Sequence, residues 1–316
     1  MCSETALIIG QGTMPVACAN TLMRVGIKVL GVSSPDEPLR TWAEANGVPY
    51  LRELSDLIAF AHSIPFDDLF SVVNYRIVPK DLLNLPRHLA INYHDAPLPR
   101  YAGVHATTWA ILNGEVTHGI TWHIMIEKVD AGDILKQVSF PIDPEDTAYK
   151  LNLMCYYTAI AAFAELAKEL REGEVRRTPQ DLSQRTYFSM RKRPENDCLI
   201  SFDWPAKQID AFCRALDFES TPNVIGQPKI VLGGRLLVVP RVLTTHTTSN
   251  AVPGSVVSVV RKTIQVATST EDILIPLVLT VGGRPVGIGE LQDYGLTPGA
   301  SLKATELSAV TFPEQM

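Results

Sequence analysis

The sequence contains few cysteines, and they follow no pattern. Five cysteines are scattered over 316 residues, so they match neither the dense disulfide framework of a small secreted domain nor the close pairs of a zinc site. Isolated cysteines are commonly buried in the core, where they behave as small apolar side chains. We therefore expect reduced and mostly structural thiols at Cys2, Cys18, Cys155, Cys198 and Cys213.

Long apolar runs and an excess of positive charge are also missing. No apolar run approaches the ~20 residues that span a bilayer, and no basic region of the kind found in signal peptides precedes the first apolar run. The chain has 28 basic and 34 acidic residues, a formal net charge of −6. Because basic side chains supply most of the affinity for a phosphate backbone, this charge disfavours nucleic acid as a partner. We expect a cytoplasmic protein without membrane contact.

The spacing of short apolar runs predicts the fold of the first half. These runs alternate with helical segments, which is the pattern of βαβ units in a doubly wound, Rossmann-like parallel sheet of the α/β class. Ligands of such sheets bind beyond the carboxyl ends of the strands. The loops after Val73 and Tyr93 are therefore the first places to look for a site. The runs are residues 6–9, 28–32, 48–51, 69–73 and 89–93.

A change of composition after the longest predicted helix indicates a second domain. Residues 147–172 repeat apolar side chains at steps of three and four, and Gly173 follows where a helix-ending glycine is expected. The next residues, 174–196, are polar and basic. Short strands separated by Gly and Pro come after them, as in a small OB-like barrel. We predict a catalytic domain at residues 1–185, a linker at 186–198 and a smaller β-rich, OB-like domain at 199–305.

A glycine-rich turn after the first strand raises the alternative of a dinucleotide-binding dehydrogenase. Gly10 and Gly12 match the first two glycines of that fingerprint, but Pro15 stands in place of the third. The second strand ends in residues 31–34, which include no acidic side chain to bind a ribose. Both departures disfavour NAD.

The densest group of polar residues follows the strand at 89–93. Residues at positions i and i+2 of a strand project from the same face, so Asn92 and His94 lie side by side at its carboxyl end. Pro97 and Pro99 then restrict the backbone of the exit loop. An amide next to an imidazole can donate hydrogen bonds to a developing oxyanion. A capping asparagine next to a structural histidine explains the same pair equally well on local grounds.

A second polar residue, Asp130, precedes a turn at Gly132. An aspartate in this place can orient His94 and favour its protonated form, or it can stabilise the loop as an Asx turn. His123 lies inside a strand pattern, and His105 lies where a helix begins. We expect structural or peripheral roles for these two histidines.

The combined pattern resembles the N10-formyltetrahydrofolate-dependent formyltransferases. The likeness is strongest over about forty residues and extends more loosely over nearly the whole chain, including residues 200–216, which resemble the start of the family's OB-like domain. The matching strings are Asn92-x-His94, Leu98-Pro99-Arg100-Tyr101-x-Gly103, Trp109-x-x-x-Asn113-Gly114-Glu115, Gly119-Ile120-Thr121-Trp122-His123 and Val129-Asp130-Ala131-Gly132-Asp133-Ile134.

The resemblance implies an enzyme, a donor and a set of site residues. Asn92, His94 and Asp130 match the catalytic trio, with Asn92 and His94 stabilising the oxyanion while Asp130 orients His94 and assists proton transfer. N10-formyltetrahydrofolate is the implied formyl donor, and no metal is implied. Ala102 departs from many relatives, which carry arginine there. The residues implied to bind the folate are Arg76, Ile77, Val78, Ile126, Val129 and Asp130.

The acceptor is predicted from finer likenesses. Residues 94–103 resemble the formylation domains that open nonribosomal peptide synthetases, which implies an aminoacyl group on the phosphopantetheine arm of a carrier protein. We prefer this acceptor. The alternative is a sugar nucleotide, because residues 289–302 resemble the tail of sugar-nucleotide formyltransferases. Methionyl-tRNA formyltransferases carry a basic insertion after the second strand, which residues 33–39 lack. A small-molecule amine or a non-catalytic folate-binding module are further alternatives; three polar groups desolvated together disfavour the idle module.

Overall fold

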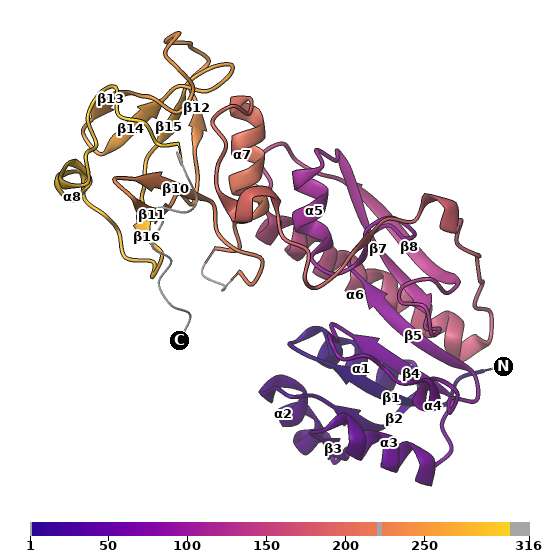
Figure 1. Ribbon diagram of the computed structural model, residues 1–316. Coiled ribbons are helices and arrows are strands. Elements are labelled where there is room, and N and C mark those ends of the chain that lie inside the picture. The colour runs from indigo at the N-terminus through magenta and orange to yellow at the C-terminus, as the bar shows by residue number, and fades with distance from the viewer. Residues whose placement is uncertain (1, 220–222, 304–316) are drawn as a thin grey trace. The chain divides into compact units, whose positions relative to one another are not determined.

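The chain divides into two compact units in the computed structural model, which describes residues 2–219 and 223–303 (Figure 1). Unit 1 comprises residues 1–107, 116–142 and 152–190, and unit 2 comprises residues 108–115, 143–151 and 191–316. The predicted domain boundaries stay a prediction, and the predicted last residue of the C-terminal domain, 305, lies outside the described residues.

Unit 1 is built on a seven-stranded sheet with the order β3-β2-β1-β4-β5-β7-β8 (Figure 1). The pairs among the first five strands of that order are parallel, whereas β7 pairs antiparallel with both β5 and β8. The predicted Rossmann-like fold is confirmed, with an antiparallel pair added at one edge. The strands are β1 (Thr5–Gly10), β2 (Lys28–Ser33), β3 (Tyr50–Leu51), β4 (Asp68–Val72), β5 (Leu89–His94), β7 (Thr117–Ile124) and β8 (Ile134–Pro141).

Helices cover both faces of this sheet, which explains why its strands are apolar throughout. In β1, Ala6 and Ile8 pack into a core shared with α1, α2 and α6, while Leu7 and Ile9 pack into a second core with α3 and α4. A parallel strand buried on both faces is expected to show such a continuous apolar run. These helices are α1 (Met14–Arg24), α2 (Glu37–Asn46), α3 (Leu54–Ser63), α4 (Lys80–Leu83) and α6 (Ala148–Glu172). Most of α5 (Ala106–Leu112) belongs to unit 2.

The turn between β1 and α1 is occupied by a side chain of the protein itself. The backbone N–H of Gly12 donates to Oδ2 of Asp36 at 2.6 Å. Oδ1 of the same carboxylate accepts a hydrogen bond from the Ser34 hydroxyl at 2.5 Å. A dinucleotide-binding protein directs the backbone groups of this turn at a pyrophosphate. In this chain Asp36 already takes the place of an anion, which adds to the disagreement with the dinucleotide fingerprint.

Unit 2 is rich in β-structure, as predicted for the C-terminal domain. In the part of this unit that the structure describes, the strands form two sheets, one of order β10-β11-β16 and one of order β12-β15-β14-β13, and all their pairs are antiparallel. A separate apolar core joins them to α7 and α8. The elements are α7 (Ala206–Ala215), β10 (Lys229–Leu232), β11 (Arg235–Val238), β12 (Leu243–Thr244), β13 (Val256–Val260), β14 (Thr263–Val266), β15 (Ile273–Ile275), β16 (Leu279–Thr280) and α8 (Ile288–Asp293).

All five cysteines lie in the described part of the chain, and each is a free thiol. Four are buried and Cys2 is exposed. Burial raises the pKa of the Cys198 thiol to about 11. Across residues 2–219 and 223–303, no helix is long and apolar enough to cross a membrane, and no group of acidic, His and Cys side chains has the arrangement of a metal site.

Candidate active site

The pairing of β5 with β7 brings the predicted residues onto one face of the sheet. Asn92 lies directly opposite His123, and His94 lies opposite Thr121. Side chains directly opposite in an antiparallel pair project from the same face. The alternate residues of both strands, including Tyr93 and Trp122, turn toward the core beneath α6. The apolar face of the two strands packs against the core, and the opposite face presents the polar side chains of the candidate site.

His94 is held in one orientation by a backbone carbonyl. Its side chain is only 6% exposed, and Nε2 lies 2.8 Å from the carbonyl oxygen of Tyr101. Because a carbonyl can only accept, Nε2 carries the proton and Nδ1 is the nitrogen that remains for the reaction. Nδ1 lies 3.8 Å from Oδ2 of Asp130 and 3.8 Å from Oδ1 of Asp95. Two carboxylates therefore flank this nitrogen.

Asn92 and Asp130 are linked by His123, which is 2% exposed. Nδ1 of His123 donates to the carbonyl oxygen of Ile124 at 2.9 Å, so Nε2 of the neutral ring accepts from the Asn92 amide at 3.2 Å. The same Nε2 lies 3.4 Å from Oδ1 of Asp130. The other amide hydrogen of Asn92 is directed to the carbonyl oxygen of Tyr93 at 2.9 Å. His123 thus lies between the side chains of Asn92 and Asp130 and contacts both.

Asp130 is a buried carboxylate that stays ionised. Burial by itself raises its pKa, but the nearby imidazoles of His94 and His123 and the backbone N–H of Gly103 lower it by more. The result is a pKa well below the usual range of an aspartate. The Gly103 N–H donates to Oδ2 at 2.8 Å, and the backbone of Asp130 has a φ of +52°. A charged carboxylate at this depth stabilises a protonated imidazole beside it.

We expect Asp130 to make folding stability depend on pH at the acidic end. Its folded pKa lies below the value of about 3.9 for an unfolded aspartate, so its stabilising effect is complete above that value and is lost as the pH falls toward the folded pKa. Asp130→Asn should therefore unfold at a lower urea concentration than wild type at pH 7. The gap between the two midpoints should narrow when the titrations are repeated between pH ~5 and ~3. A gap of constant size would contradict this assignment.

The residues predicted to hold the folate lie on the loops after β4 and β7. Ile77, Ile126 and Val129 are exposed aliphatic side chains, at 76%, 46% and 40%. Val78 packs partly against the core beside α3, and the Arg76 guanidinium turns back to the Ser33 hydroxyl at 3.3 Å. Exposed apolar side chains gathered at a polar site commonly mark a ligand surface. Their contact with folate stays a prediction.

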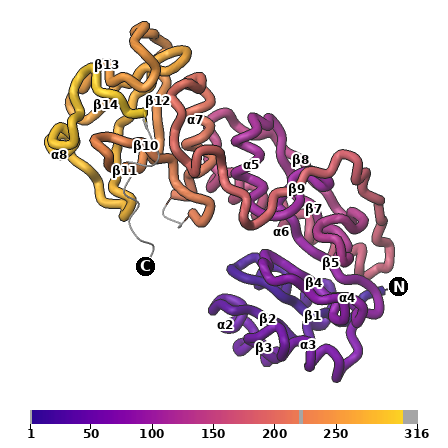
Figure 2. The backbone as a smooth tube through the Cα atoms, viewed as in Figure 1, coloured from indigo at the N-terminus to yellow at the C-terminus, as the bar shows by residue number. Residues whose placement is uncertain are grey.

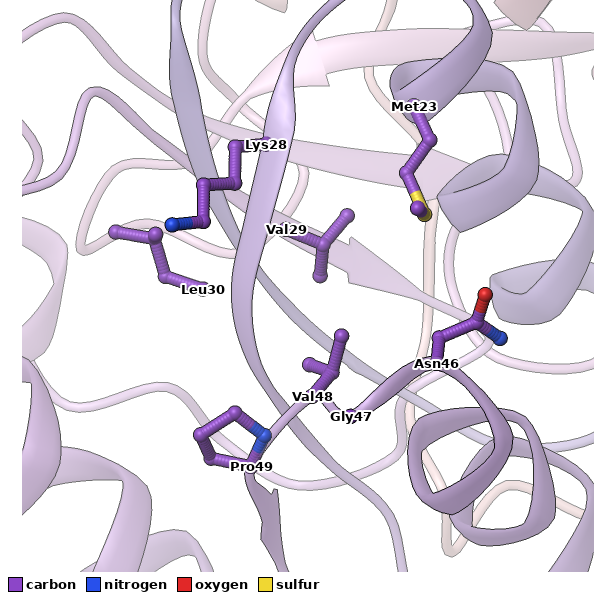
Figure 3. Close-up of a pocket in the computed structure, with 8 residues that line it drawn as sticks. All are labelled: Met23, Lys28, Val29, Leu30, Asn46, Gly47, Val48 and Pro49. Atoms are coloured by element: carbon purple, nitrogen blue, oxygen red, sulfur yellow. The ribbon is translucent and has the colours of Figure 1, made fainter.

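One open pocket of unit 1 lies away from these loops. It is formed where α1 ends, along the start of β2 and where α2 meets β3 (Figure 3). None of the predicted catalytic or folate-binding residues lines it, and Lys28 is the single charged side chain among its walls. The start of a parallel strand is the opposite end from that at which such sheets bind ligands. The pocket is lined by Met23, Lys28, Val29, Leu30, Asn46, Gly47, Val48 and Pro49.

Comparison with known proteins identifies the family. Residues 62–158 match the formyl transferase family, and residues 193–292 match the formyl transferase C-terminal domain. Methionyl-tRNA formyltransferase of Synechococcus sp. (strain JA-3-3Ab) is 32% identical over 268 residues, which is 82% of this chain and 81% of that protein. The chain belongs to the formyltransferase family. Methionyl-tRNA formyltransferase of Geotalea uraniireducens is 29% identical over 314 residues, covering 93% of this chain and 97% of its own length.

Solved structures share the fold, and two of those compared here by name are described as formyltransferases. The sugar 3N-formyl transferase WlaRD aligns with a TM-score of 0.65 at 18% identity, covering 86% of this chain and 97% of that one. The N-formyltransferase of Helicobacter canadensis aligns with the same TM-score and the same identity, covering 90% of this chain and 100% of that one. HypX of Aquifex aeolicus, solved with tetrahydrofolic acid, aligns at a TM-score of 0.62 and 14% identity over 88% of this chain and 44% of its own.

These comparisons confirm the prediction of a formyltransferase enzyme. They lend no support to the finer resemblance to the formylation domains of peptide synthetases, because the similar proteins are described as methionyl-tRNA and sugar formyltransferases. The structural or peripheral role expected for His123 stays a prediction, and the structure adds that its side chain lies 3.2 Å from the Asn92 amide and 3.4 Å from the Asp130 carboxylate. The alternation of apolar and polar residues along 120–124 was a usable signal, because it places His123 on the face opposite Trp122.

Proposed function

We propose that the protein transfers the formyl group of N10-formyltetrahydrofolate to the α-amino group of an aminoacyl ester or thioester. The observation that carries formyl transfer is His94, fixed through Nε2, with Nδ1 between two carboxylates. The folate donor is supported by the family and by similar structures, since WlaRD was solved with 5-N-formyl-THF and HypX with tetrahydrofolic acid.

The reaction needs an amine nucleophile and a place for one negative charge. The neutral amine attacks the formyl carbon, a new N–C bond forms, and the formyl oxygen becomes an oxyanion. Protonated Nδ1 of His94 and the amide of Asn92 stabilise this charge. The bond from carbon to N10 then breaks, and N10 takes up a proton while the attacking nitrogen loses one. The charged carboxylate of Asp130, 3.8 Å from Nδ1, stabilises positive charge on the imidazole.

His123 orients the amide of Asn92 for this task. Its Nε2 lies 3.2 Å from the Asn92 amide nitrogen and accepts one amide hydrogen, and the carbonyl oxygen of Tyr93 accepts the other. For the amide to stabilise the oxyanion, one of these two hydrogen bonds must be exchanged for a hydrogen bond to the formyl oxygen.

A second carboxylate favours an amine that arrives as a cation. Asp95 follows His94 directly, is 28% exposed on its side chain, and lies 3.8 Å from Nδ1. A partly exposed carboxylate attracts an ammonium group and can keep it near the imidazole while it loses its proton. An aminoacyl ester or thioester presents such a group next to its carbonyl.

The relatives support an aminoacyl acceptor. The charge of the C-terminal residues bears on whether that aminoacyl group is attached to tRNA or to a carrier protein. The curated relatives that match along most of their length are described as methionyl-tRNA formyltransferases, and methionyl-tRNA is an aminoacyl ester. Residues 191–316 contain twelve basic and twelve acidic residues, which gives no excess of positive charge for RNA. A thioester on a carrier protein presents the same amine without the phosphate backbone. The second candidate is a nucleotide-linked amino sugar, because the Helicobacter canadensis structure holds dTDP-3-aminofucose.

The test is a transfer assay with matched acceptors. Purified protein and saturating N10-formyltetrahydrofolate are incubated with methionyl-tRNA, with aminoacyl-pantetheine thioesters and with dTDP-amino sugars, and kcat/KM is measured for each. The proposal expects the aminoacyl acceptors to lead and Asp95→Asn to raise their KM while the KM of the donor stays unchanged. An amino sugar with the highest kcat/KM would overturn the acceptor, and absence of transfer to every amine would overturn the function.

A further inference from the structure

The site depends on two loops whose backbones do not adopt common conformations. Tyr101, whose carbonyl holds His94, has a φ of +60°, and Asp130 has a φ of +52°. Neither residue is glycine, so each occupies the left-handed region at a cost that the surrounding structure must offset. The two loops are 29 positions apart in sequence, and they are joined directly by the hydrogen bond from Gly103 to Asp130.

Residues 178–188, which follow α6, are bonded to the loop that carries Asp130. Thr178 exchanges two backbone hydrogen bonds with Ile134, at 2.8 and 2.9 Å. The side chain of Gln180 donates to the carbonyl oxygens of Asp130 at 3.1 Å and Gly132 at 2.6 Å. The carbonyl oxygens of Asp130 and Gly132, at the turn that follows Asp130, therefore each accept a hydrogen bond from this segment.

The same segment is bonded to the loop that carries Tyr101. The hydroxyl of Thr186 accepts from the backbone N–H of Tyr101 at 2.8 Å, and the carbonyl of Thr186 accepts from Ala102 at 3.0 Å. Strand β9 (Tyr187–Phe188), labelled in Figure 2, pairs in parallel with β6 (Ala102–Gly103). The ring of Phe188 stacks on that of Tyr101 with centroids 5.5 Å apart.

The polar composition of this segment is typical of a linker between domains. Its hydrogen bonds, however, hold backbone groups of the two loops in place. Both donor hydrogens of Gln180 and the hydroxyl of Thr186 are used on backbone groups beside catalytic residues. An additional contact comes from the Arg185 guanidinium, which donates to the carbonyl oxygen of Val129 at 3.0 Å. A passive connection between domains has no need for side-chain bonds concentrated at two strained turns.

We propose that residues 178–188 are a positioning element of the formyl-transfer site. Through Thr186 they fix the carbonyl of Tyr101 against the Nε2–H of His94, and through Gln180 they fix the carboxylate of Asp130 beside Nδ1. This inference rests on the proposed function, and it adds residues that act through His94 and Asp130 without touching the substrate. Small displacements of catalytic groups reduce turnover strongly, because the geometry of attack is lost.

The test uses two substitutions with matched controls in the full-length protein. Thr186→Val removes the hydroxyl at constant shape, and Thr186→Ser restores it. Gln180→Leu removes the two donors, and Gln208→Leu makes the same change at an exposed residue of α7, outside this segment. We expect Thr186→Val and Gln180→Leu each to lower kcat about tenfold or more, with the KM of the donor unchanged. Thr186→Ser and Gln208→Leu should keep wild-type kcat.

Two further readouts separate positioning from general damage. In an Asp130→Asn background, Gln180→Leu should cause no further loss of turnover, because its effect passes through Asp130. The imidazole N–H signal of His94, followed by NMR, should change in Thr186→Val and not in Thr186→Ser. The NMR measurement needs no turnover, so it tests the inference even if no acceptor is formylated. Unchanged kcat in an active enzyme, an unchanged His94 signal, or an equal loss in both backgrounds would overturn it.

Discussion

His94→Ala is expected to lower kcat for formyl transfer by about 10²–10³, the cost of removing one oxyanion donor. The loss falls on turnover because Nδ1 acts on the charge that develops during attack, while the exposed aliphatic side chains that we assign to the folate lie on other loops. The measurement is steady-state kinetics with varied donor, together with binding of tetrahydrofolate. Affinity for tetrahydrofolate should stay close to that of wild type.

The matched control for this prediction is His62→Ala. His62 is an exposed residue of α3 and is none of the predicted catalytic or folate-binding residues, so its removal should leave both kcat and KM unchanged. His94→Ala with near-native turnover would show that the imidazole is not the group that stabilises the oxyanion. A loss of tetrahydrofolate binding in His94→Ala would instead place His94 in the donor pocket.

Much of the fold was predictable because burial on two faces leaves a strong signal. The runs at β1, β4 and β5 are apolar at consecutive positions, and only a strand covered by helices on both sides needs that pattern. The direction of β7 and β8 was not predictable in this way. Direction follows from which strand lies next to them, and local periodicity carries no information about that neighbour.

Only some of the site residues could be identified from local sequence patterns. Asn92 and His94 were accessible because their relation is fixed by the alternation of a single strand. His123 depends on the register between β5 and β7, which local patterns do not specify. Gln180 and Thr186 were missed for another reason. Their partners lie about 50 and 85 positions away, and a polar side chain that supports a distant backbone has the same local sequence as one in a solvated linker.

Substitution of Gly103 tests whether the pairing of β6 with β9 positions Asp130. Its φ is +101°, and a Cβ built there would collide with the carbonyl oxygen of Phe188 in β9. Its N–H also donates to Asp130 at 2.8 Å. Both the absence of a side chain and the direction of the N–H are therefore needed for β6 and β9 to pair beside the carboxylate.

Gly103→Ala should lower kcat by about 10² or more, since a displacement of about 1 Å in a catalytic group is enough for such a loss. It should also lower the free energy of unfolding by about 1–3 kcal/mol, because alanine is strained at this φ. The control is Gly47→Ala in the same unit, where φ is +64° but no atom lies near the added Cβ. In Gly47→Ala, urea titration should show only the loss of stability that comes from backbone strain, and steady-state kinetics should show an unchanged kcat. If Gly103→Ala loses stability by the same amount as Gly47→Ala and keeps its kcat, the pairing of β6 with β9 has no part in placing Asp130.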